Sequence, residues 1–284
     1  MISHLKKRVS TSKYSRIKFP KLFKFRNYCF LRRAPKSIEL IIEQAENVEN
    51  FKNLLKNISK RDIKKIQERT KWQATSEEWY KYRKCAITST ATKRLLSVAK
   101  RLENNNSFNK AISKYGNSYF RNEAMEWGVR CEKYAIEEVW KYFRAKHLEP
   151  QRRQVGLCMD KDIKFLCASP DNIFSCICCG NHNERYYYTI EAKCPFILRD
   201  EGIQASNKLP YLDDKGLLKS CHSYYHQICV ACGVNDIKCA LFIIWTPFGS
   251  KIQEIEFDSL LYEKIKSDAK YYYYNYYLKS QKIY

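Results

Sequence analysis

Two short motifs with carboxylates constrain the fold of this sequence more than any other feature. The first is Ser-Pro-Asp, which ends at Asp171, and the second is Ile-Glu-Ala-Lys-Cys-Pro, which contains Glu191 and Lys193. Because strand side chains alternate, Glu191 and Lys193 lie on one face of a strand and reach one site. A carboxylate pair at the end of a hairpin suits a hard divalent cation, which prefers oxygen ligands. The motifs predict a metal site at which Lys193 orients or helps to deprotonate water and stabilises phosphate charge.

The order of predicted elements around these motifs indicates the fold class. Helices come first, and strands are expected at residues 155–159, 163–168, 185–193, 237–245 and 251–257, the second of them running on to Asp171. A helix precedes the fourth strand, and another follows the fifth from about Ser259. This order predicts an α/β fold with a central mixed β-sheet flanked by helices. The tyrosines of residues 271–277 are expected to pack the last helix on the core rather than to stack on bases.

Polar residues also accompany two helices predicted before the strands. Thr75 and Glu78 have the spacing of a capping box at the start of the first helix, and Arg83 lies near its end. Thr88 and Thr90 lie at the start of the second helix. Hydroxyls and amides at a helix start bind anions, and arginine holds phosphate through paired hydrogen bonds. The segment fits either a phosphate site or a capped surface helix with a solvated arginine.

Two further candidate residues lie on helices on either side of the strands. Residues 117–146 predict a long helix, and Glu132 adjoins its apolar stripe. A carboxylate beside an apolar face needs a partner, and a metal ion is one that suits. Gln227, in the pattern Tyr-x-x-Gln that begins at Tyr224, can position water or a phosphate oxygen but cannot act as a base. By itself, Glu132 also fits an ordinary boundary residue.

Taken together, these motifs resemble the PD-(D/E)-x-K nuclease signature. The longer form, Ser-Pro-Asp followed by Glu-x-Lys-Cys-Pro, is similar to the YqaJ-like viral recombinases, relatives of phage lambda exonuclease and viral alkaline nucleases. The resemblance extends over roughly residues 72–250 and implies a restriction-endonuclease-like core. It implies catalytic roles for Asp171, Glu191, Lys193 and Gln227. It implies metal ligands in Glu132, Asp171, Glu191 and the Ala192 carbonyl. It implies DNA phosphate contacts for Arg83, Thr88 and Thr90.

The same resemblance implies a function. It suggests a deoxyribonuclease dependent on Mg²⁺ or Mn²⁺ that digests linear double-stranded DNA ends 5′→3′ in recombination or repair. A single-strand annealing protein and a homo-oligomeric assembly are the partners that it implies beside DNA. Two alternatives stay open: a catalytically inactive DNA-binding scaffold for recombination, and an endonuclease that selects branched or single-stranded DNA.

Charge and composition narrow the class of partner. The net charge of +22 indicates a polyanionic partner, with nucleic acid ahead of an anionic membrane surface. The sequence has no run of eighteen apolar residues, so no membrane span is expected. Its thirteen cysteines are scattered and odd in number, and no secretory signal is recognisable, so reduced thiols in an intracellular compartment are expected. The nucleus is the favoured location in a eukaryote.

The chain divides into three predicted parts. Residues 1–38 form a basic arm, residues 39–70 a helical lead-in with a break near Ser59, and residues 71–284 the nuclease domain. The arm has twelve Lys or Arg before residue 37 and no acidic residue, which fits DNA binding, nuclear or mitochondrial targeting, or a solubilising tail. Two short helices are expected in the lead-in.

One cysteine cluster fits two interpretations, a zinc site and a hairpin turn. Cys176, Cys178, Cys179 and His182 lie within seven residues, and structural zinc takes four Cys or His ligands. The adjacent thiols of Cys178 and Cys179, and the lack of a second Cys-x-x-Cys pair, argue against zinc. A tight hairpin turn is the favoured interpretation.

Overall fold

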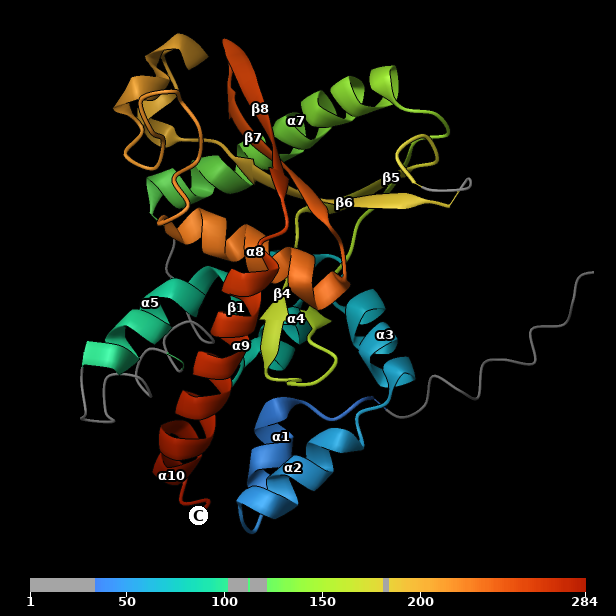
Figure 1. Cartoon of the computed structure of the whole chain (residues 1–284), viewed down its shortest axis with the longest axis vertical. Coiled ribbons are helices and arrows are strands. Elements are labelled where there is room, and N and C mark those ends of the chain that lie inside the picture. The colour runs from blue at the N-terminus through green and yellow to red at the C-terminus, as the bar shows by residue number, and fades with distance from the viewer. Residues whose placement is uncertain (1–33, 102–111, 113–121, 181–183) are drawn as a thin grey trace, which may run out of the picture. The chain divides into compact units, whose positions relative to one another are not determined.

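The computed structural model describes residues 34–101, 112, 122–180 and 184–284 (Figure 1). In this part the helices are α1 (Ile38–Gln44), α2 (Val48–Lys56), α3 (Lys60–Arg69), α4 (Glu77–Arg83), α5 (Ser89–Arg101), α7 (Glu123–Lys146), α8 (Ser223–Asn235), α9 (Ser259–Tyr272) and α10 (Leu278–Ser280). The strands are β1 (Ile87–Thr88), β2 (Gln151–Arg153), β3 (Cys158–Met159), β4 (Leu166–Ala168), β5 (Asn172–Cys176), β6 (Tyr186–Lys193), β7 (Cys239–Thr246) and β8 (Gly249–Glu256). The basic arm lies outside the described residues up to residue 33. Among the described helices, none is both long and apolar enough to cross a membrane.

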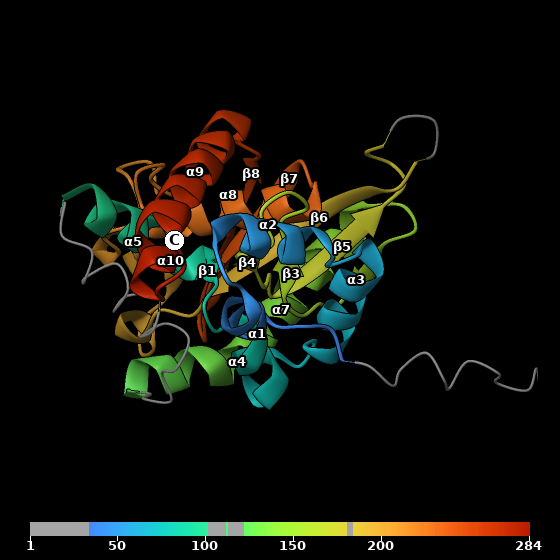
Figure 2. The same ribbon diagram turned by 90° about the horizontal axis from the view of Figure 1, so that it is seen from below.

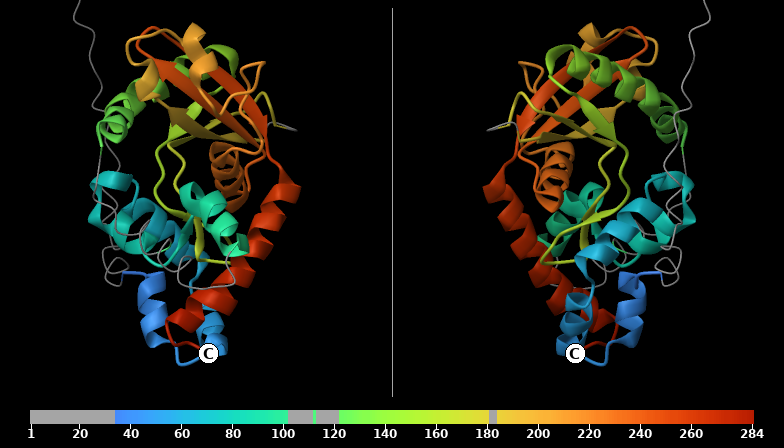
Figure 3. Two further views of the ribbon diagram at one scale, coloured as in Figure 1. Left: turned by 90° about the vertical axis from the view of Figure 1, so that its left-hand side faces the viewer. Right: turned by 90° about the vertical axis from the view of Figure 1, so that its right-hand side faces the viewer.

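A five-stranded mixed sheet carries the residues that the sequence motifs identify. Its strand order is β2-β5-β6-β7-β8, with β6 and β7 parallel and the other neighbours antiparallel. Glu191 on the central strand β6 pairs in register with Phe242 on β7. Helices α7 and α8 pack against this sheet (Figures 1 and 3). The central mixed sheet flanked by helices is therefore confirmed.

Alternate residues of β6 face different helices, and this decides where the site lies. Ile190 belongs to the apolar core that α7 covers. The hydroxyl of Thr189 instead lies 3.2 Å from Cys232 Sγ on α8. Glu191 and Lys193 alternate with Ile190 along the strand, so their side chains point to the side of α8.

The segment before Asp171 differs from its prediction. The expected strand at residues 163–168 does not run on to Asp171, because β4 ends at Ala168 and a new strand, β5, begins at Asn172. Strand β4 belongs to a second sheet of order β1-β4-β3, whereas β5 joins the five-stranded sheet. Pro170 explains the break, since proline lacks a backbone N–H and cannot continue a hydrogen-bonded ladder.

The second sheet and the helices around it share one core (Figure 2). The ring of Phe165 stacks on that of Tyr273 with 3.8 Å between their centroids, and both side chains are fully buried. Phe51 of α2 packs on the same Tyr273 ring at 6.0 Å. Tyr277 is also buried in this core. The tyrosines at positions 273 and 277 thus pack the C-terminal helical segment on the core, as expected.

The lead-in contains three helices, not two. The predicted break at Ser59 is present, because the Ser59 hydroxyl and the Asp62 carboxylate cap the start of α3 reciprocally. A second break lies at Asn47, whose side chain accepts a hydrogen bond from the Asn50 N–H and begins α2. The same apolar periodicity continues across this break, so periodicity did not reveal it.

The capping box predicted from Thr75 and Glu78 is wrong. Helix α4 begins at Glu77, and the Thr75 hydroxyl donates to the Trp72 carbonyl at 2.8 Å. The Glu78 carboxylate instead accepts from Arg69 Nε at 2.9 and 3.1 Å. A paired guanidinium offers Glu78 stronger hydrogen bonds than a single backbone amide.

Candidate active site

Asp171 is fixed at the open end of the β5–β6 hairpin. Its backbone N–H donates to the Ile190 carbonyl at 3.1 Å, and its Oδ2 accepts from the Ala192 N–H at 2.7 Å. The N–H and C=O of one strand residue point to the same side, so the Ala192 carbonyl also lies on the edge that faces Asp171. The structure thus places two of the predicted metal ligands, Asp171 and Ala192, together.

Glu191 receives two donors at one oxygen. Gln227, from the second turn of α8, donates from Nε2 to Glu191 Oε1 at 2.7 Å, and Lys193 Nζ donates to the same oxygen. Glu191 and Gln227 are buried, with 3% and 7% of their surface exposed. The ammonium of Lys193 also lies 4.6 Å from the ring centre of Tyr224. The four residues with predicted catalytic roles therefore meet between β6, α8 and the start of β5.

The protonation state of Lys193 limits what it can do. Burial acts to lower its pKa, but the negative charges of Glu191 and Asp171 outweigh burial and raise that pKa above the usual lysine value. These two carboxylates therefore favour the ammonium form of Lys193. In that form the group can orient water and stabilise charge on a phosphate.

The carboxylates of this site repel one another. Burial raises the pKa of Asp171 well above its usual range, and the charges of Glu191 and Glu132 raise it further. Glu132, on α7, also has a raised pKa because of burial and the charge of Glu191. Oxygen donors that resist ionisation next to one another form a set that a hard divalent cation would stabilise. Glu132, Asp171, Glu191 and the Ala192 carbonyl suit such an ion by their chemistry, although the three carboxylates do not all lie within 4.8 Å of one another in the structure.

Arg83 is the last residue of α4, and a neighbouring tryptophan of that helix connects it to the site. Its guanidinium carbon is 3.8 Å from the ring centre of Trp79, and Trp79 Nε1 donates to Ser169 Oγ at 2.9 Å. Ser169 precedes Asp171 by two residues. Burial lowers the pKa of Arg83 to about 10, and no carboxylate of the described residues forms a salt bridge with it. A half-buried cation without a carboxylate partner is suited to hold a phosphate.

Thr88 and Thr90 flank the first residue of α5. Thr88 is buried at the end of β1, where it pairs with Cys167 of β4, and Thr90 is exposed. Their hydroxyl oxygens are 3.4 Å apart. Both hydroxyls thus lie at the helix start at which the sequence placed them.

Gln73 is a positioning residue that the sequence did not reveal. Its side-chain amide donates to the Pro170 carbonyl at 2.9 Å and to the Val155 carbonyl at 3.0 Å. Its backbone has a φ of 44°, a left-handed conformation that is uncommon outside glycine. Gln73 thereby holds the residue before Asp171 in place. No periodicity or motif marks this glutamine among the polar residues around it.

Comparisons with known proteins agree with this architecture. The model of the YqaJ-like viral recombinase domain matches residues 78–236. The chain is similar to an alkaline exonuclease from Laribacter hongkongensis, with 19% sequence identity, a TM-score of 0.50, and coverage of 72% of this chain and 94% of that chain. The structure of that exonuclease in complex with dAMP gives a TM-score of 0.51 at the same identity and coverage. A search of the curated proteins gives no match.

The family match covers the region of the candidate site. The matched segment begins on α4 and ends at the last turn of α8, so it contains every candidate residue from Arg83 to Gln227. It accounts for more than half of the chain. The chain belongs to the YqaJ-like viral recombinase domain family, and its core has the restriction-endonuclease-like fold of the phage-type exonucleases.

Proposed function

We propose that this chain is a divalent-metal-dependent deoxyribonuclease that digests linear duplex DNA from its ends in the 5′→3′ direction, in recombination or repair. The observation that carries the proposal is the meeting of Asp171, Glu191, Lys193 and Gln227 at one half-buried site, with Glu132 close enough to perturb Asp171. Family membership and the fold shared with an alkaline exonuclease support it. The net charge of +22 supports DNA as the polyanionic partner.

The proposed cofactor is Mg²⁺ or Mn²⁺, held by Glu132, Asp171, Glu191 and the Ala192 carbonyl. When bound, such an ion lowers the pKa of a water molecule and offsets charge on the phosphate. The Lys193 ammonium stabilises the negative charge that develops on the phosphate oxygens. The amide of Gln227 holds Glu191 with one N–H, and its second N–H is available to a water molecule or a phosphate oxygen.

Binding of the DNA end is assigned to the segment around α4 and α5. Arg83 binds the 5′-terminal phosphate beside the site, and the hydroxyls of Thr88 and Thr90 assist it. Trp79 holds the guanidinium in place and connects it to Ser169. A homo-oligomer and a single-strand annealing protein are the further partners proposed by family resemblance.

Nucleotide release from a linear, 5′-phosphorylated duplex in the presence of Mg²⁺ or Mn²⁺ tests the proposal. Lys193→Met is expected to lower the rate by about 10²–10⁴-fold, the usual contribution of a positioned catalytic group. Lys279→Met, which removes an exposed lysine of α10, is the matched control and should retain the wild-type rate.

A covalently closed circle is the second substrate. Release from the linear DNA alone supports an end-dependent exonuclease, whereas cleavage of the circle favours the endonuclease alternative. DNA binding that is equal with and without metal, without any nucleotide release, refutes the nuclease and favours the scaffold. The labelled end from which nucleotides appear first decides the direction of digestion.

A further inference from the structure

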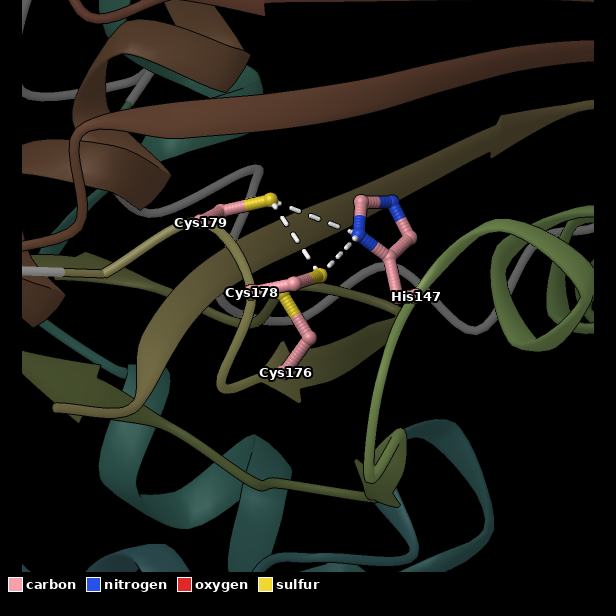
Figure 4. Close-up of side chains that lie close together, drawn as sticks. All are labelled: His147, Cys176, Cys178 and Cys179. Atoms are coloured by element: carbon pink, nitrogen blue, oxygen red, sulfur yellow. Dashed lines mark hydrogen bonds between the residues drawn. The ribbon is translucent and has the colours of Figure 1, made fainter. Parts of the chain in front are cut away.

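A group of sulfur and nitrogen ligands lies at the opposite end of the hairpin from the candidate active site. The ligand atoms of His147, Cys176, Cys178 and Cys179 all lie within 4.8 Å of one another (Figure 4). His147 Nδ1 is 3.3 Å from Cys178 Sγ and 3.4 Å from Cys179 Sγ, and the two sulfurs are 3.8 Å apart. Among the described residues, this is the one group of three or more His, Cys, Asp or Glu side chains that meets so closely.

These three separations are close to edges of a zinc tetrahedron, and Cys176 Sγ lies within 4.8 Å of the other ligand atoms. With Zn–S bonds of about 2.3 Å and Zn–N bonds of about 2.0–2.1 Å, tetrahedral angles place two sulfurs roughly 3.8 Å apart and a nitrogen roughly 3.6 Å from a sulfur. We propose that His147, Cys176, Cys178 and Cys179 bind one Zn²⁺ ion. Four protein ligands leave no open coordination position, so the site is structural rather than catalytic.

The fourth ligand comes from a distant part of the chain. His147 is the residue that follows α7, whereas Cys176 ends β5 and the other two cysteines lie in the turn that leads to β6. The sequence offered His182 as the neighbouring histidine, but that residue lies outside the described residues. His147 replaces it here because the end of α7 meets the hairpin turn.

Neighbouring groups already orient the proposed ligands. The imidazole of His147 stacks on Phe143, with 4.1 Å between ring centroids, which fixes the plane of the ring. The backbone N–H of Leu148 donates to Cys178 Sγ at 3.4 Å. Hydrogen bonds of this kind stabilise a thiolate, the form in which cysteine binds metals, and they hold the ligand in place.

The proposed ion would join the two elements that carry the metal ligands of the active site. Helix α7 bears Glu132 in its interior and ends next to His147, and the hairpin bears Asp171 at one end and the cysteines at the other. At the rise of a strand, the five residue-to-residue steps from Asp171 to Cys176 span about 17 Å, so the two sites are separate. Zinc would therefore fix the hairpin against α7 without taking part in the reaction.

The first measurement is the metal content of the full-length protein, produced with zinc in the medium and purified without metal-affinity steps or chelators. About one zinc per chain is expected in the wild-type protein. His147→Ala and Cys178→Ser should lose it. Cys221→Ser, which changes an exposed cysteine outside the group, is the matched control and should keep it.

Two further measurements identify the residues that bind the zinc ion. Asp171→Asn and His182→Ala should both retain zinc, because neither residue belongs to the proposed set. Cobalt added to the zinc-free wild-type protein should give the charge-transfer absorption of thiolate ligation, a result that does not depend on how any variant folds. A hydrogen-bonded thiol cluster would give neither zinc nor this absorption, and that outcome overturns the proposal. Retention of zinc in His147→Ala and its loss in His182→Ala would overturn the ligand set.

Discussion

Replacing Asp171 with asparagine should stabilise the metal-free protein while it abolishes stabilisation by metal. Asp171 is half-buried near Glu191 and Glu132, and both this burial and those charges raise its pKa. In the wild-type protein, Asp171 Oδ2 accepts a hydrogen bond from the Ala192 N–H at 2.7 Å. Asparagine keeps an oxygen that can accept this bond, and it removes the negative charge. Because the folded pKa exceeds the unfolded one, the metal-free wild-type protein loses stability as pH rises from the ordinary aspartate range through the raised folded value. The variant should lose less stability over the same pH range.

The gain in stability of the metal-free variant depends on how far the folded pKa of Asp171 lies above its unfolded pKa. Each unit by which the folded pKa exceeds the unfolded pKa costs about 1.4 kcal/mol at a pH above both values. For a domain of this length, each kcal/mol changes the melting temperature by roughly 2–4 °C. The hydrogen bond from the Ala192 N–H contributes about 1 kcal/mol to stability. Because asparagine can still accept this bond, the substitution should lose only a small part of that contribution. At mildly alkaline pH the metal-free variant should therefore melt above the wild-type protein, by roughly 3–6 °C for each unit by which the folded pKa exceeds the unfolded pKa.

Thermal melts with and without Mn²⁺, in buffer without chelators that would strip thiolate-bound zinc, test this reasoning. At a metal concentration about 100-fold above Kd, the wild-type protein should gain about 2.7 kcal/mol, whereas the variant should gain little. The difference in melting temperature should thus move in favour of the wild-type protein when metal is added. If Asp171→Asn melts below the wild-type protein in metal-free alkaline buffer, or if Mn²⁺ stabilises both equally, the assignment of Asp171 as a repelled metal ligand is wrong.

Two further predictions concern Arg83 and the glycines. Arg83→Lys keeps the charge but loses paired hydrogen bonds, so kcat/KM on 5′-phosphorylated ends should fall by about 10–100-fold; an equal fall on 5′-hydroxyl ends would remove the proposed role. Gly156→Ala should destabilise the fold by about 2–4 kcal/mol, because its new Cβ would lie 2.2 Å from the buried Thr70 hydroxyl and 2.4 Å from backbone. Gly128→Ala is the matched contrast: nothing lies within 4 Å of its Cβ position inside α7, so denaturant melts should show a gain of about 0.5–1 kcal/mol. Equal effects of the two glycine changes would contradict the packing argument.

The sequence could predict that Glu191 and Lys193 meet because their arrangement depends on local spacing. The two-residue separation of Glu191 and Lys193 places both on one strand face in any register, and the structure has them in contact. Gln227 came from a motif on a helix, and its contact with Glu191 matches the position that the resemblance implied.

The sequence did not reveal contacts between residues that lie far apart along the chain, because no local pattern shows which distant segments pack together. Gln73 reaches Pro170 across a long stretch of chain, and no local pattern encodes that contact. His147 meets the hairpin turn only because α7 ends there, whereas His182 was the nearer histidine in sequence. Glu78 was assigned to a helix cap because its partner, Arg69, lies on a different helix.

The candidate site residues lie far apart along the chain, so the site can assemble only late in folding. Glu132 comes from α7, Asp171 and Glu191 from the two sides of a hairpin, and Gln227 from α8. The parallel pairing of β6 with β7 encloses α8 in its connection, so it forms only after a long loop of chain has closed. An incompletely folded chain, such as one still being synthesised, therefore lacks an assembled site. On the proposed function, a nascent chain would be harmless to DNA until its core is complete.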